Sequence, residues 1–289
     1  MVSVERVFFE VPKNEGNDDI IKLEGLVLQP HGQANGKVVF AQGFPGSFDF
    51  YYNFLQVLAE EFTVITYYSR GLGSSEGKFN SQGGGDLASI VRAVKGSNEK
   101  VALIGNSLGT AFCIQAVAES EGAISSVYLI NPFLGNKFLP GIKRYGPLLL
   151  YLLSSAGVAT VAEKATKLIS QPKQQLYQHN IDFGRKVAEL ARLRVPQGLD
   201  DVPTAFTLAD CDQVLGTTNN ANRYDYLVGI IQGVIPSAKD FSRAVRGLNH
   251  FLTYPGEGGP FGGRANGAFM DSVVRFTTDN LVTERQISK

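Results

Sequence analysis

The sequence predicts an α/β fold, in which a mainly parallel sheet is covered by helices on both faces. Short apolar, β-branched runs alternate along the chain with helix-like stretches, and this alternation is typical of βαβ units. A chain of 289 residues with 44% hydrophobic residues can also bury a large core. Because no internal repeat or low-complexity linker is visible, we expect a single domain over residues 1–289.

The strands are predicted from their apolar and β-branched character and from the turn residues that bound them. The first two have no helix between them, so we expect a hairpin ahead of the alternating part. The last strand carries the weakest signal. In chain order, the expected strands are residues 4–11, 23–28, 37–41, 63–68, 100–104, 125–130, 204–208 and 240–245.

Helices are predicted in the stretches that separate most of these strands. The expected helices are residues 51–61, 86–94, 107–119, 221–234 and 268–280. Beyond Asn131-Pro132 the alternation stops, and Val195-Pro196 marks its return. Since residues between these points are helix-like without strand signals, we expect a helical cap insertion at about 132–194, between core segments 1–131 and 195–289.

Within the predicted cap, residues 145–162 carry no charge and reach the length at which a membrane span must be considered. Gly146, Pro147 and several hydroxyl residues dilute the apolar character, and the flanking segments fit a globular fold. We therefore expect an apolar cap helix that faces a substrate pocket or the core, with a membrane span as the alternative.

Composition narrows the classes of partner. The formal net charge is zero and the basic residues form no long run, so nucleic acid and anionic membranes are not expected partners. Cys113 and Cys211 cannot form a disulfide framework, and no Cys/His spacing resembles a metal site. The first ten residues lack a basic segment followed by an apolar one, which favours a cytoplasmic protein over a secreted one.

A serine between two glycines carries the main chemical signal. Residues 105–109 read Gly-Asn-Ser-Leu-Gly, directly after an apolar strand and before a helix. This order presents an exposed nucleophile on a strained turn, where Gly105 and Gly109 remove the crowding around Ser107. The backbone N–H of Leu108, at the helix start, is then available to a developing oxyanion.

The same spacing occurs once more, in residues 73–77, which read Gly-Ser-Ser-Glu-Gly. A glycine-rich turn precedes this match and no helix follows it directly. We therefore interpret Ser75 as a loop residue.

A serine nucleophile needs a base, and the chain has three histidines. His31 lies in a polar turn between two predicted strands, and His179 lies in the predicted cap. His250 follows the last predicted strand, and it alone satisfies the expected chain order of serine, acid and histidine. A loop histidine without a role remains the alternative for His250.

The orienting carboxylate is expected after the strand at 204–208 and before His250. Asp210 and Asp212 both fit this interval. Asp212 is favoured because a loop of about four residues brings an acid over the sheet end, and Asp210 remains the alternative.

A second oxyanion donor is expected from another loop at the same sheet edge. The strand at 37–41 ends in a sharp turn that contains Gly43, Phe44 and Pro45. Gly43 permits a close backbone approach, so that the N–H of Phe44 could join that of Leu108. An ordinary strand-to-helix turn is the alternative.

Together these segments resemble the α/β-hydrolase superfamily, in the branch with serine esterases, monoacylglycerol-lipase-like enzymes and serine aminopeptidases. They follow the family's order and span most of the chain. The matching segments are residues 42–46, 68–75, 105–109, 209–212 and 249–251.

The resemblance implies roles for five residues. Ser107 would be the nucleophile, His250 the general base and then acid, and Asp212 the orienting carboxylate. The N–H groups of Phe44 and Leu108 would form the oxyanion hole. No metal and no cofactor is implied.

Three positions depart from the family pattern. Gln42 stands where histidine is common, Tyr68 where aspartate is common, and Ala209 where glycine is common. Because the oxyanion hole uses backbone N–H groups, Gln42 need not abolish activity.

The working hypothesis is a cofactor-free serine hydrolase that cleaves an ester through an acyl-enzyme intermediate. The apolar segment 148–153 suggests a small-molecule substrate with a hydrophobic part. The same triad could serve thioesters, peptide N-termini, carbon–carbon bonds or acyl transfer, and a binding protein on this fold is the alternative of another class. A nicotinamide or flavin site is not expected, because Glu76 stands where the third glycine of the dinucleotide fingerprint belongs.

Overall fold

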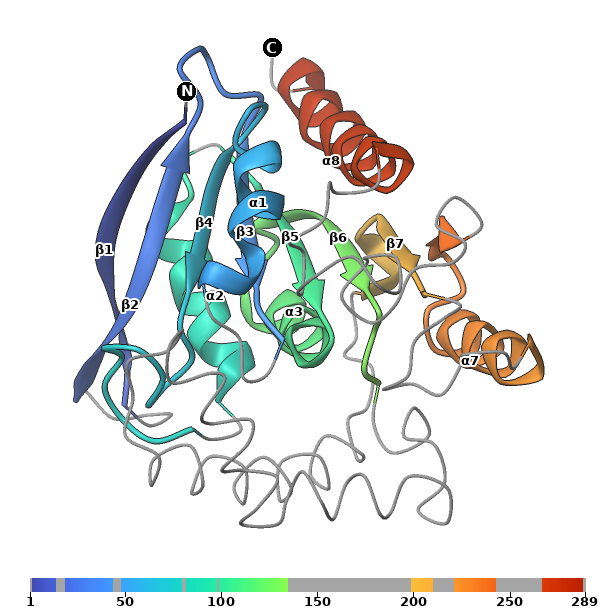
Figure 1. Cartoon of the computed structure of the whole chain (residues 1–289), viewed down its shortest axis with the longest axis horizontal. Helices are drawn as coiled ribbons and strands as arrows, with labels where there is room; N and C mark the ends of the chain where they lie inside the picture. The colour runs from blue at the N-terminus through green and yellow to red at the C-terminus, as the bar shows by residue number, and fades with distance from the viewer. Residues whose placement is uncertain are drawn as a thin grey trace.

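The computed structural model describes residues 2–13, 19–43, 48–79, 82–97, 99–134, 199–209, 221–242 and 267–287. Within them, one eight-stranded sheet has the order β1-β2-β4-β3-β5-β6-β7-β8 (Figure 1). The strands are β1 (Ser3–Pro12), β2 (Ile20–Gln29), β3 (Lys37–Ala41), β4 (Thr63–Tyr67), β5 (Val101–Asn106), β6 (Ile124–Ile130), β7 (Thr204–Thr207) and β8 (Lys239–Asp240). The helices are α1 (Phe48–Leu58), α2 (Gly83–Val94), α3 (Leu108–Glu119), the short 3-10 helix η2 (Leu199–Asp201), α7 (Ala221–Val234) and α8 (Gly267–Ile287).

The strand pairing confirms a mainly parallel sheet that begins with a hairpin. Strand β1 pairs with β2 antiparallel, from Ser3 opposite Gln29 to Pro12 opposite Ile20. Strand β2 also pairs antiparallel with β4, whereas β4, β3, β5, β6, β7 and β8 pair parallel with their neighbours. The carboxyl ends of these parallel strands therefore meet at one edge of the sheet, where ligands bind in open α/β sheets.

Alternate side chains of each parallel strand pack on opposite faces of the sheet. In β5, Leu103 belongs to the core under α2, α3 and α7, and Ile104 belongs to the core under α1 and α8. All six positions of β5 are buried, as expected for a strand covered on both faces. Figure 1 shows α1 and α8 on one side of the sheet and α2 and α3 on the other.

Several boundaries differ from the sequence expectation. Helix α2 begins at Gly83, three residues before the predicted start. A Cβ at Gly83 would overlap the ring of Phe112 in α3. The glycines there permit the close α2–α3 approach, which helix propensity does not reveal. Helix α8 runs to Ile287, beyond the predicted 280. The predicted cap, except for 132–134, lies outside the described residues.

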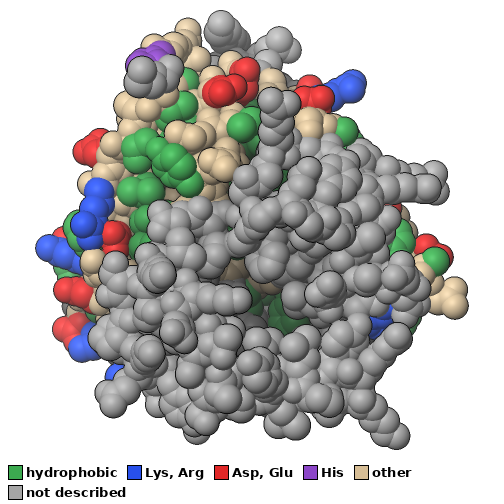
Figure 2. Space-filling model, viewed as in Figure 1, with side chains coloured by type: hydrophobic (Ala, Val, Ile, Leu, Met, Phe, Trp, Pro, Cys, Tyr) green, Lys and Arg blue, Asp and Glu red, His purple; other side chains and the backbone are tan. Residues whose placement is uncertain are grey.

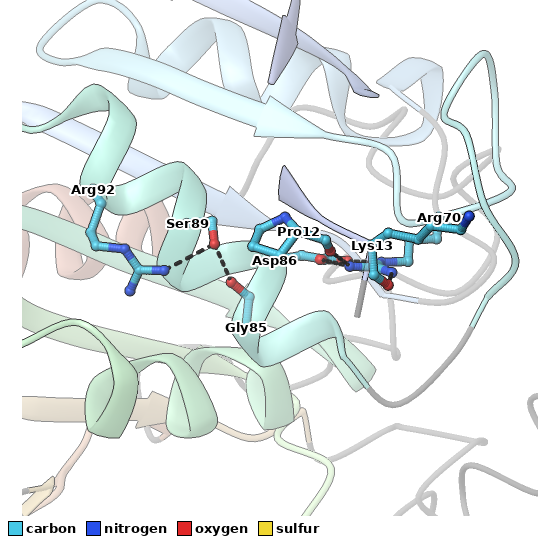
Figure 3. A network of polar contacts seen from close by, with 7 residues as sticks. All are labelled: Pro12, Lys13, Arg70, Gly85, Asp86, Ser89 and Arg92. Carbon is cyan, nitrogen blue, oxygen red and sulfur yellow. Dashed lines mark hydrogen bonds and ion pairs between the residues drawn. The ribbon is translucent and has the colours of Figure 1, made fainter. Parts of the chain in front are cut away.

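A buried ion pair joins the loop after β4 to helix α2 (Figure 3). Arg70 donates two hydrogen bonds to Asp86, from Nε to Oδ2 at 2.8 Å and from Nη2 to Oδ1 at 2.6 Å. Its other donors reach the backbone carbonyls of Pro12 and Lys13, at the end of β1. Burial raises the pKa of Asp86, and the Arg70 guanidinium opposes that rise. Arg70 thus ties three segments together.

Replacing Arg70 with methionine should destabilise the fold strongly, because it leaves the Asp86 carboxylate buried without its cation. We expect a loss of about 3 to 5 kcal/mol in the free energy of unfolding, or roughly 6 to 15 °C in Tm. Arg92→Met is the matched control. Arg92 lies on helix α2, which also carries Asp86, but its hydrogen bonds to the Glu119 carbonyl oxygen and to Ser89 Oγ are exposed. Urea denaturation of both variants measures the difference, and equal losses would contradict the expectation.

Candidate active site

Ser107 occupies the strained turn that the sequence predicts. It lies between the last residue of β5 and the first residue of α3, with φ 50° and ψ −117°. Its N–H donates to the carbonyl oxygen of Ile130 at 2.9 Å, which fixes the turn against β6. Its side chain is only partly buried, whereas the positions on both sides are fully buried. Such a non-glycine residue with positive φ at a strand end is typical of a functional site.

The two flanking glycines are required by close backbone contacts. A Cβ on Gly105 would lie 2.8 Å from the carbonyl oxygen of Gly109 and from the Cα of Thr110. A Cβ on Gly109 would overlap the carbonyl oxygen of Ala41, at the end of β3. The steric reason for the glycine–serine–glycine spacing is therefore present in the structure.

The start of helix α3 leaves backbone donors beside Ser107. The N–H of Leu108 is the first of the helix and has no intrahelical acceptor, because only later N–H groups reach a carbonyl one turn back. The Thr110 N–H donates to the Ser107 carbonyl oxygen at 3.1 Å. The Thr110 hydroxyl accepts the N–H of Phe133 at 2.9 Å. This helix end also carries the positive end of the helix dipole, which favours an anion.

Gly43 comes close to the serine from the neighbouring turn. A Cβ on Gly43 would lie 3.1 Å from the Cβ of Ser107 and 3.0 Å from Oδ1 of Asn106. The Gly43 N–H donates to the hydroxyl of Tyr51 in α1 at 3.1 Å. Beside it, Gln42 donates from Nε2 to the Thr66 hydroxyl at 3.0 Å. The turn after β3 and the serine turn are thus in contact.

Four of the predicted site residues lie outside the described residues: Phe44, Asp210, Asp212 and His250. The strand before the aspartates, β7, is parallel to β5 and separated from it only by β6. Loops that follow β5 and β7 therefore open at the same edge of the sheet.

Two hydrogen bonds hold Leu208 and Ala209, the residues that follow β7. The Ala209 N–H donates to Oδ1 of Asn131 at 2.7 Å, and the Leu208 N–H donates to Oγ of Ser242 at 2.8 Å. Asn131 is buried and has φ 46°, a conformation that asparagine tolerates better than most residues. Sequence reasoning missed Asn131 as a support of this loop, although an asparagine before a proline at a strand end was visible.

The surroundings of Ser75 and His31 argue against a catalytic role for either residue. Ser75 is buried, and its Oγ accepts the Glu24 N–H at 2.9 Å and donates to the Tyr68 carbonyl at 2.9 Å. Ser75 is therefore a loop support, as predicted. His31 is exposed in the turn that leads into β3, at the sheet edge opposite to the one reached by the end of β5.

The other described side chains offer neither a reactive thiol nor a metal site. Burial raises the pKa of the Cys113 thiol, which disfavours a thiolate. In the described part of the chain, no group of three or more His, Cys, Asp or Glu residues could hold a metal ion. Among the described residues, no helix is both long and apolar enough to cross a membrane. Figure 2 shows the molecule from the same side as Figure 1, with acidic and basic side chains interspersed over the described part of this face.

Comparison with solved structures finds the same fold in proteins of low sequence identity. DcsB in complex with its substrate analogue has a TM-score of 0.63 at 16% identity, and the match covers 97% of this chain and 100% of that one. The enol-lactonase from Burkholderia xenovorans LB400 gives 0.58 at 15%, covering 89% and 97%. The Pyrococcus furiosus esterase Pf2001 gives 0.58 at 16%, covering 96% and 91%. Comparison with curated protein sequences finds no significant match.

A family model supplies the sequence-level assignment. The model described as alpha/beta hydrolase fold matches residues 37–183, which is just over half of the chain. The matched range contains Gly43, the Ser107 turn and strands β3 to β6. With the mainly parallel sheet and the strained serine after β5, this match shows that the chain belongs to the α/β-hydrolase fold family.

Proposed function

We propose that the protein is a serine hydrolase that cleaves a carboxylic ester with a hydrophobic acyl or alcohol part. The observation that carries the proposal is the strained, partly exposed Ser107 between β5 and α3. A structural serine does not need a strained conformation with positive φ and two close-packed glycines, whereas a nucleophile presented at a sheet edge does.

In the first half of the proposed reaction, Ser107 Oγ attacks the ester carbonyl carbon while His250 accepts the hydroxyl proton. Asp212 orients the imidazole and stabilises its charged form. The N–H groups of Leu108 and Phe44 bind the oxyanion of the tetrahedral intermediate. When that intermediate collapses, the bond to the alcohol oxygen breaks, and the alcohol leaves with the proton from His250.

In the second half, water attacks the acyl-enzyme while His250 again accepts a proton. The second tetrahedral intermediate uses the same oxyanion donors. Its collapse returns the proton to Ser107 and releases the carboxylic acid. The hydrophobic part of the substrate is inferred from the apolar segment 148–153 in the predicted cap.

Two measurements on the wild-type protein test this proposal. We expect hydrolysis of p-nitrophenyl esters in a series from acetate to palmitate, with an optimum that reports the size of the acyl pocket. We also expect covalent labelling at Ser107 by a fluorophosphonate, because only an activated serine reacts. Labelling without ester hydrolysis would transfer the proposal to thioester, peptide or carbon–carbon substrates. Absence of both would favour a binding protein.

Paired aspartate variants identify the acid. We expect Asp212→Asn to lower kcat by roughly 10²- to 10⁴-fold, because an amide no longer stabilises the imidazolium. We expect Asp210→Asn to change kcat by less than about threefold, since the proposed mechanism gives Asp210 no part in the reaction. Steady-state hydrolysis of the preferred ester measures both. The reverse order of effects would assign the role to Asp210.

A further inference from the structure

Tyr51 links the two backbone segments that flank the candidate oxyanion site. Its hydroxyl accepts the Gly43 N–H at 3.1 Å and donates to Oδ1 of Asn106 at 3.1 Å. Gly43 lies in the turn after β3, and Asn106 is the last residue of β5, directly before Ser107. One phenol therefore connects the predicted oxyanion turn to the strand that carries the nucleophile.

The tyrosine is held rigidly in the core beneath this turn. It is 4% exposed, and its ring meets that of Phe40 edge-on at a centroid distance of 4.9 Å. Burial raises the pKa of Tyr51, so the hydroxyl stays protonated and can act as donor and acceptor together. A phenylalanine would fill nearly the same space but would leave the Gly43 N–H without this acceptor.

The contact geometry leaves little room for the turn to move. A Cβ on Gly43 would fall 3.0 Å from Asn106 Oδ1, 3.1 Å from Ser107 Cβ and 3.1 Å from the Tyr51 hydroxyl oxygen. An added Cβ would thus be closer to these atoms than most real Cβ atoms are to their neighbours. The Gly43 backbone therefore packs directly against Ser107. A shift of the peptide between Gln42 and Gly43 would change the direction of the following N–H.

The geometry points to Tyr51 as a positioning residue for ester hydrolysis: its hydroxyl fixes the Gly43 peptide relative to Asn106 and Ser107. In the proposed function, the next N–H along the chain after Gly43 is an oxyanion donor. This inference rests on the proposed function. Tyr51 acts through Gly43 and Asn106 and is not required to touch the substrate. Because a donor misplaced by about 1 Å can cost up to 10²-fold in rate, deletion of one hydroxyl should be measurable.

The test is Tyr51→Phe, assayed with the p-nitrophenyl ester that the wild type prefers. We expect kcat to fall by about 10- to 100-fold while KM changes by less than about twofold, because the loss is confined to transition-state stabilisation. The rate of labelling by the fluorophosphonate should fall in parallel, and the pH dependence of kcat should keep its shape. A wild-type kcat in folded Tyr51→Phe would overturn the inference.

Tyr128→Phe is the matched control. Tyr128 is equally buried, and its hydroxyl bonds to Thr207 Oγ1 at 2.6 Å and to Ser272 Oγ at 3.0 Å. It should lose stability like Tyr51→Phe but keep the wild-type kcat. An equal fall of kcat in both variants would mean that Tyr51 acts only through packing, and the inference would be wrong.

A second variant covers the case in which Tyr51→Phe does not fold. Asn106→Ala removes the acceptor at the other end of the link and should show the same lowering of kcat at nearly constant KM; a wild-type kcat would contradict the inference. Failure of the proposed function has a different signature. In that case the wild-type protein itself would neither hydrolyse the esters nor be labelled at Ser107.

Discussion

Replacing Ser107 with alanine is expected to lower kcat for ester hydrolysis by roughly 10⁴- to 10⁶-fold and to abolish covalent labelling by a fluorophosphonate. Alanine keeps the Cβ, so the strained turn with φ 50° and its close packing against Gly43 should be preserved. The Ser107 N–H bond to Ile130 also remains, because it is a backbone interaction. The variant should therefore fold with nearly wild-type stability, and its loss of activity reports the missing hydroxyl alone.

Ser75→Ala is the control for Ser107→Ala, since Ser75 occupies the second match to the same motif. Its hydroxyl bonds the Glu24 N–H and the Tyr68 carbonyl, so its removal should cost about 1 to 3 kcal/mol of stability. Activity at a temperature where the variant is folded should stay near wild type. Loss of labelling in Ser75→Ala together with full activity in Ser107→Ala would reverse the assignment of the nucleophile.

The strand pattern predicted the architecture well because its causes are local. Apolar runs bounded by turn residues located each of the first seven strands to within three residues of its observed limits, and the missing helix between the first two predicted the hairpin. The eighth strand was the exception. The strand itself is only Lys239–Asp240, and the Phe241 N–H still donates to the Phe206 carbonyl oxygen of β7 at 2.9 Å. Residues 243–245 of the predicted strand lie outside the described residues.

Local pattern could not predict contacts between distant segments. The close approach of α2 to α3 at Gly83 involves the ring of Phe112, and the role of Asn131 depends on the Ala209 N–H from another strand end. For the candidate site, the motif predicted the strained turn at Ser107 and its two glycines, because their requirement is steric and local. Tyr51 gave no such signal, since its partners Gly43 and Asn106 meet it only through the packing of α1 on the sheet.

Replacing Gly109 with alanine is the second change with a large expected effect. The new Cβ would overlap the Ala41 carbonyl oxygen and lie 2.7 Å from the Gln42 carbonyl oxygen, and both contacts are to backbone that cannot rotate away. Helix α3 and the end of β3 must therefore separate. That movement displaces the Gly43 turn from Ser107 and from the Leu108 N–H. We expect kcat/KM to fall by more than about 10³-fold, with a Tm lower by several degrees.

Gly229→Ala separates this steric effect from the general effect of exchanging a helical glycine for alanine. Gly229 lies in α7, is exposed, and has no atom within 4 Å of an added Cβ. Alanine there should raise stability by about 0.5 to 1 kcal/mol, because it favours the helix, and should leave kcat/KM unchanged. Thermal denaturation should thus show a lower Tm for Gly109→Ala and a higher Tm for Gly229→Ala. Ester hydrolysis should be lost only in Gly109→Ala. If Gly109→Ala kept wild-type activity, the close contact between β3 and α3 would not be what holds the oxyanion donors at Ser107, and the proposed arrangement of the site would be wrong.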